Sequence, residues 1–195
     1  MNLLKILYGH DSGGVLVYEK QYMESLRKKD INIDGIVFGN GKALSHYKKY
    51  LDTFMLVENG LPSFGGNAAK KLMSVLTNNI LSYRMVSRMK GDLAKNRYNA
   101  VGVSRPSLLS FAGRIGTFLN CPTLWHLPDS VGSKLGRFYY QATCKYWDIT
   151  PIANSRYTAR TLGMPDTPVI YPGFSRNRLS LGKKKVGTLR SDLNI

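Results

Sequence analysis

The chain has 195 residues, of which 43% are hydrophobic and 21% charged, the composition of a soluble globular protein with one sizeable domain. No apolar stretch approaches the ~20 residues that span a bilayer, and the short apolar N-terminal run, broken at Gly9–Asp11, is a poor signal peptide, so we expect a cytoplasmic location. The net charge of +16 favours an anionic partner (nucleic acid, an acidic membrane or a phosphate-bearing small molecule), although a basic surface that only aids solubility explains it equally well.

Predicted strands and helices alternate along the chain. Short apolar runs next to turn residues predict strands at Leu3–Tyr8, Ile31–Phe38, Thr53–Val57, Asn99–Ser104, Pro122–His126, Ile149–Ala153 and Pro168–Tyr171. Apolar spacing of three and four predicts helices from Gly14 to the basic run ending at Lys29, from Asn67 to about Lys95, and at Pro106–Leu119, Lys134–Trp147 and Ser155–Leu162.

Two of these helices have a well-defined apolar face. In the first, Tyr18, Tyr22 and Leu26 share one face, and Glu19 falls on another. In the helix that begins at Asn67, one stripe holds Leu72, Val75, Leu76, Ile80, Tyr83, Val86 and Met89.

The alternation predicts an α/β fold, a Rossmann-like parallel sheet with helices on both faces. We expect residues 1–174 to form this domain. Residues 175–195 are rich in lysine and arginine and have little to bury, which is typical of a linker that leads into another element.

Ligands of open α/β sheets bind outside the carboxyl ends of the strands. This rule selects four segments: Gly9–Gly14, Ser104–Ser107, His126–Ser130 and Tyr171–Gly173. Gly13 and Gly14 precede a helix N-terminus, which attracts phosphate. They match neither the dinucleotide-binding nor the P-loop pattern, so a plain tight turn remains an alternative.

His126 is the strongest catalytic candidate, because it ends an apolar strand and could bind a substrate or transfer a proton. A packed histidine bonded to a nearby carbonyl is an equally good interpretation. Asp129 beside it, and Asp11 with His10, could join one polar cluster. The two cysteines, Cys121 and Cys144, do not form a disulfide framework, and the scattered histidines predict no metal site.

Three segments in the right order resemble family 4 glycosyltransferases of the GT-B fold. They are GHDSGGVLVYEKQYMESLRKKD (9–30), YNAVGVSRPSLLSFAGRIGTFLNCPTLWHLPDS (98–130) and PIANSRYTARTLGMPDTPVIYPGF (151–174). The resemblance covers nearly the whole chain but only the N-terminal, acceptor-side half of that two-domain family. The tail GKKKVGTLRSDLNI resembles the linker and first helix of the second domain.

The resemblance implies a retaining hexosyltransferase that needs no metal or other cofactor and uses a nucleotide sugar as donor. Gly13 and Gly14 match the loop that faces the donor phosphates, and His126 matches a histidine near the donor sugar and the acceptor. His10, Asp11, Arg105 and Asp129 are possible acceptor-side residues. The family's strand-four histidine is replaced here by Ser104 or Arg105, and its Asn-Gly by Pro172-Gly173.

The resemblance further implies a glycan or lipid-linked acceptor, a role in cell-envelope glycan or glycolipid synthesis, and a second domain without which the chain is inactive. Glycosyltransferases of this fold often dock on the inner face of anionic membranes. The basic segments HYKKY (46–50), Lys70-Lys71 and Arg84–Lys90 would serve, although solvated helix faces explain each one. A non-catalytic, membrane-recruiting subunit of a split enzyme is the alternative function. Nucleic acid is an unlikely partner, since no nucleic-acid-binding signature is present.

Overall fold

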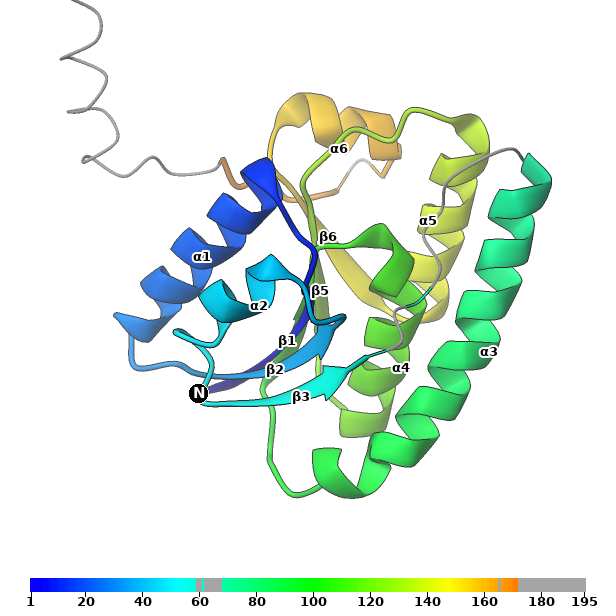
Figure 1. Cartoon of the computed structure of the whole chain (residues 1–195). Helices are drawn as coiled ribbons and strands as arrows, with labels where there is room; N and C mark the ends of the chain where they lie inside the picture. The colour runs from blue at the N-terminus through cyan, green and yellow to red at the C-terminus, as the bar shows by residue number, and fades with distance from the viewer. Residues whose placement is uncertain (59–60, 62–67, 165, 172–195) are drawn as a thin grey trace, which may run out of the picture.

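The computed structural model describes residues 1–58, 61, 68–164 and 166–171, and it has an α/β fold (Figure 1). Its strands are β1 (Asn2–Tyr8), β2 (Asn32–Phe38), β3 (Thr53–Val57), β4 (Ala100–Val103), β5 (Thr123–Leu127) and β6 (Ile149–Ala153). Its helices are α1 (Gly13–Arg27), α2 (Lys42–Tyr47), α3 (Ala68–Leu93), α4 (Leu109–Leu119), α5 (Lys134–Tyr146) and α6 (Arg156–Leu162), with a 3-10 turn at Pro106–Leu108.

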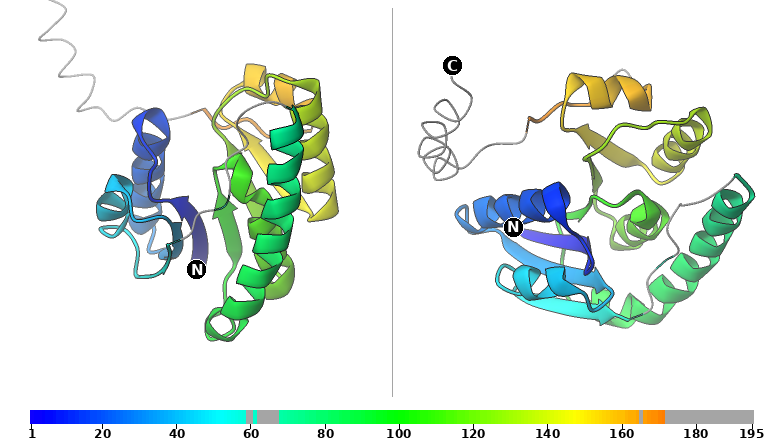
Figure 2. Two further views of the ribbon diagram at one scale, coloured as in Figure 1. Left: turned by 45° about the vertical axis from the view of Figure 1, so that its right-hand side comes forward. Right: turned by 45° about the horizontal axis from the view of Figure 1, so that its top comes forward.

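The six strands form one parallel sheet in the order β3-β2-β1-β4-β5-β6. Helices α1 and α2 lie on one face, and α3, α4 and α5 lie on the other (Figure 2). The predicted Rossmann-like sheet with helices on both faces is therefore confirmed. The strand order reverses between β1 and β4, so the chain leaves these two strands toward opposite faces of the sheet. This point of the carboxyl edge is where open α/β sheets bind ligands, and we call it the crevice.

Two predictions of secondary structure were incomplete. The strand expected at Pro168–Tyr171 is a single parallel bridge between Ala153 and Val169. Helix α2 was not predicted, because its six residues are too few to show a helical period. Pro172-Gly173 and the linker at 175–195 lie outside the described residues, so the domain boundary stays a prediction.

A hydrophobic core fills each side of the sheet. Successive residues of β1 point to opposite faces, so Leu4 and Ile6 join the core beneath α3–α5, while Leu7 joins the smaller core beneath α1 and α2. Lys5 faces α1 from the middle of the same strand and is only 2% exposed.

The apolar stripe that the sequence predicts on α3 is buried in one part and exposed in another. Val86 is buried and Met89 packs against the core, but Leu76, Ile80 and Tyr83 remain more than half exposed. The helix lies outside α4, farther from the sheet (Figure 1), so only one edge of a broad stripe meets a neighbour. The stripe is therefore not a single buried face.

Glycine holds the loop after β1 close to the loop after β2. The Gly9 carbonyl accepts from the N–H of Ala43 at 3.0 Å, and a Cβ at position 9 would lie 1.9 Å from the carbonyl oxygen of Gly39. This contact lets α2 begin directly beside the first loop.

Replacing Gly9 with alanine should lower the free energy of unfolding by about 3 kcal/mol, because the two loop backbones must separate. Gly91→Ala in α3 is the matched control, since a Cβ there meets no atom within 4 Å. It should raise the free energy by about 0.5–1 kcal/mol. Urea unfolding of both variants measures these changes, and equal stabilities would contradict the backbone contact.

Candidate functional site

The loops after β1 and β4 meet at the crevice through an ion pair. The guanidinium of Arg105, just beyond β4, binds the carboxylate of Asp11, just beyond β1. Tyr47 of α2 donates a hydrogen bond to the other Asp11 oxygen at 2.8 Å. Burial raises the pKa of Asp11 even though both partners favour its charged form. The predicted residues Asp11 and Arg105 are thus brought together.

A second ion pair lies beneath α1. Lys5 Nζ is 2.9 Å from Glu19 Oε2, and both side chains are at most 2% exposed. Ser104, next to Arg105, donates a hydrogen bond to the Glu19 carboxylate. Glu19 therefore joins α1 to both β1 and the end of β4, although the sequence placed it on a different face from the apolar residues of this helix.

His126 of β5 lies under the same helix. Its ring stacks on Tyr18 of α1 with centroids 3.7 Å apart and an interplanar angle of 8°. Both ring nitrogens are buried, and neither has a hydrogen-bond partner among the residues that the structure describes. Burial lowers the pKa of His126 to about 4, with Glu19 opposing this shift and Lys5 adding to it. The imidazole is therefore neutral at neutral pH, with one nitrogen that can donate and one that can accept.

Gly13 and Gly14 form an open N-terminus of α1. Ser12 occupies the N-cap position without a side-chain cap, and the first turn holds no acidic residue. Gly13 has a positive φ of 58°, and nothing lies within 4 Å of a Cβ built on either glycine. The first backbone N–H groups of α1 are thus available to an anion.

Two predicted site residues lie apart from this cluster. His10 is exposed and its ring packs against Gly39 and Gly41, while Asp129 is exposed in the loop that follows β5. The sequence reasoning missed Lys5 and Glu19 as a buried pair. A lysine in the middle of an apolar strand was the available signal, because a buried ammonium needs a partner.

No group of three histidine, cysteine, aspartate or glutamate side chains that could hold a metal ion occurs among the described residues. Within the same ranges, none of the helices has the length and apolar character needed to cross a membrane. Cys144 is buried and Cys121 partly buried, and neither forms a disulfide; burial raises the pKa of the Cys144 thiol to about 12.

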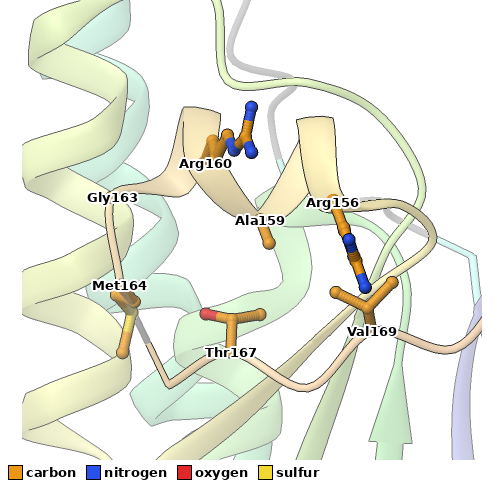
Figure 3. Close-up of a pocket in the computed structure, with 7 residues that line it drawn as sticks. All are labelled: Arg156, Ala159, Arg160, Gly163, Met164, Thr167 and Val169. Atoms are coloured by element: carbon orange, nitrogen blue, oxygen red, sulfur yellow. The ribbon is translucent and has the colours of Figure 1, made fainter.

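A cavity of about 370 Å³ lies along α6 (Figure 3). Arg156 and Arg160 of α6 contribute to its lining, and the buried Thr167 lies on the opposite side. None of the residues that line it belongs to the Asp11–Arg105 or His126 clusters, so it is separate from the crevice at β1 and β4.

No protein-family model and no curated protein sequence matches the chain. Its structure is similar to halves of GT-B glycosyltransferases. Anabaena HepE in complex with UDP and glucose has a TM-score of 0.62 and 15% identity over 96% of this chain and 50% of HepE. Its complex with UDP-glucose has a TM-score of 0.63, 15% identity and the same coverage. Acinetobacter baumannii MurG has a TM-score of 0.53 and 13% identity over 90% of this chain and 46% of MurG.

These similarities define the class of fold, a Rossmann-like α/β domain similar to the halves of GT-B glycosyltransferases. The chain spans about half the length of these solved structures. At identities this low, the similarity shows the fold only, and the substrate and the mechanism must be inferred from the residues of this chain.

The depressed pKa of His126 predicts a stability change with pH. The unfolded imidazole takes up a proton near pH 6.5, but the folded one does so only near pH 4. Lowering the pH from 6.5 to 4 should therefore reduce the free energy of unfolding by about 3 kcal/mol. His126→Asn should lack this component, as measured by urea unfolding at several pH values.

Asp11 contributes with the opposite sign, because its raised pKa favours the folded state as the pH falls. Asp11 is present in both the unmodified chain and His126→Asn, so the difference between their pH profiles isolates the contribution of His126. Parallel pH profiles would show that His126 is not held neutral.

Proposed function

We propose that the chain is the acceptor-side N-terminal half of a retaining, family 4-like glycosyltransferase that transfers a hexose from a nucleotide sugar. The proposal depends on one observation: the uncapped N-terminus of α1 opens at the strand-order reversal of a GT-B-like half, and the same helix covers the buried, neutral His126. HepE, which has the same half-fold, is described in complex with UDP-glucose.

In the proposed reaction, the donor phosphates lie against the backbone N–H groups at Gly13 and Gly14. Negative charge grows on the leaving phosphate as the sugar bond breaks, and fixed N–H dipoles stabilise that charge without reorganising. This role of the backbone N–H groups requires no metal or other cofactor. Arg105 lies partly exposed at the same edge, with its charge paired to the carboxylate of Asp11.

His126 would orient the sugar or the acceptor through a neutral ring nitrogen. An imidazole with a pKa near 4 is a hydrogen-bond donor and acceptor at pH 7 rather than an acid. Its buried nitrogens require that Tyr18 shift, or that substrate enter beside it, before contact is made.

A second domain, on the same or another chain, would supply the remaining nucleotide contacts, so we expect the isolated chain to be inactive. A glycan or lipid-linked acceptor for the cell envelope suits this proposal.

Gly14→Asp tests the phosphate position. The new side chain has free space and favours the helix N-terminus, so the fold should keep its stability. Its carboxylate should repel the donor phosphates and weaken UDP-sugar binding about tenfold or more, which corresponds to about 1.4 kcal/mol. Calorimetric titration of the protein with its second domain measures this, with Gly14→Ala as the neutral control. Equal affinities of the two variants would place the phosphates elsewhere.

His126→Ala tests the histidine. In the complete two-domain protein it should lower kcat about a hundredfold, with the fold retained by circular dichroism. His46→Ala in α2 is the control, because His46 lies outside the cluster. Unchanged turnover in His126→Ala would remove this residue from the reaction.

A further inference from the structure

Two arginines without a counter-ion line the pocket along α6. Arg156 is the first residue of this helix and reaches toward Val169, and Arg160 follows one turn later (Figure 3). Both are exposed, and neither forms an ion pair within the described part of the chain, even with the exposed Asp166 nearby. Like charges at this spacing repel, and a cation at a helix N-terminus opposes the helix dipole. The pair therefore does not stabilise α6 and favours an anionic ligand.

Thr167 lies across the pocket from the helix (Figure 3). Its side chain is only 8% exposed, and its Oγ1 is buried without a hydrogen-bond partner among the described residues. A buried hydroxyl without a partner costs free energy, so such groups are rare in folded proteins. A ligand oxygen in the pocket would satisfy this hydroxyl, which can donate as well as accept.

The rest of the lining is small or apolar. Ala159 and Gly163 leave space beside the helix, and Met164 and Val169 provide apolar surface (Figure 3). The volume of about 370 Å³ lies within the range of small-molecule pockets, roughly 300–1,000 Å³. This space exceeds what a bare inorganic anion fills. The ligand that suits the pocket therefore carries an organic group as well as negative charge.

Hydrogen bonds at both ends hold α6 in place. At its start, the N-cap Ser155 accepts from the backbone N–H of Thr158 at 3.1 Å. At its end, Gln141 Nε2 of α5 donates to the carbonyls of Leu162 and Gly163 at 2.8 and 3.0 Å. The backbone of the helix is thus fixed before a ligand binds, and only the two arginine side chains need to become ordered.

We propose that the α6 pocket binds a small organic phosphomonoester. The phosphate group, with about two negative charges at neutral pH, lies between Arg156, Arg160 and the hydroxyl of Thr167. Guanidinium groups suit it because their paired N–H groups match phosphate oxygens. The organic group lies against Met164 and Val169. A carboxylate would bring one charge to two arginines, and a bare phosphate would leave the apolar surface unused. The inference does not rest on the proposed transfer reaction, because none of the crevice residues lines this pocket.

Titration of the isotope-labelled full chain with phenyl phosphate, followed by NMR, tests the proposal. The backbone amide signals of α6, Thr167 and Val169 should shift and saturate. Inorganic phosphate lacks the organic group and benzoate lacks the second charge, so each should bind about tenfold more weakly or worse. Equal affinities for the three compounds would overturn the proposal. So would shifts confined to Gly13 and Gly14, because the anion would then bind in the crevice.

Arg156→Gln/Arg160→Gln tests the two charges, because glutamine keeps helix propensity at exposed positions. It should weaken the binding of phenyl phosphate about a hundredfold, the loss expected when two charge-assisted contacts are removed. Arg84→Gln/Arg88→Gln in α3 is the matched control, since it removes two exposed arginines at the same spacing. The control should bind within about twofold of the unmodified chain. Equal losses in both variants would show attraction to net charge alone and would overturn the proposed site.

Thr167→Val tests the buried hydroxyl, because valine keeps the shape of the side chain and removes only its polar group. The thermal unfolding midpoint of the free protein should not fall, since the Thr167 hydroxyl has no hydrogen-bond partner among the described residues to lose. Binding of phenyl phosphate should weaken about fivefold or more. Thr167→Ser keeps the hydroxyl and should bind within about twofold of the unmodified chain. A Thr167→Val variant that binds as tightly as the unmodified chain would overturn the proposed site.

Discussion

The buried ion pair between Lys5 and Glu19 is the contact on which the arrangement of the crevice depends. Each charge would be costly to remove from water alone, and each is compensated only where β1 and α1 bring the two together. Ser104 extends the contact to β4. The pair therefore holds α1 in one position across the strands that border the crevice.

Once α1 is held there, two features of the candidate site follow. Its N-terminus opens at the carboxyl edge with unpaired N–H groups, and Tyr18 lies on the His126 ring. The Asp11–Arg105 pair joins the loops on either side of the same crevice. Unpaired N–H groups and a neutral imidazole are thus combined under one helix.

On the surface of α3, by contrast, large apolar side chains are exposed to water and charged cations border them. A long helix packed along one edge has more apolar residues than its neighbour can cover.

The sequence by itself determined the six strands and the order of the longer helices along the chain, because the spacing of apolar residues reports local conformation; it missed the short helix α2. It also located Gly13, Gly14 and His126 at strand ends. Only the tertiary structure decided that Glu19 meets Lys5, that Arg105 meets Asp11 and that half of the α3 stripe is exposed. These contacts join residues 14 and 94 positions apart, so they depend on how the elements pack, which local periodicity does not encode.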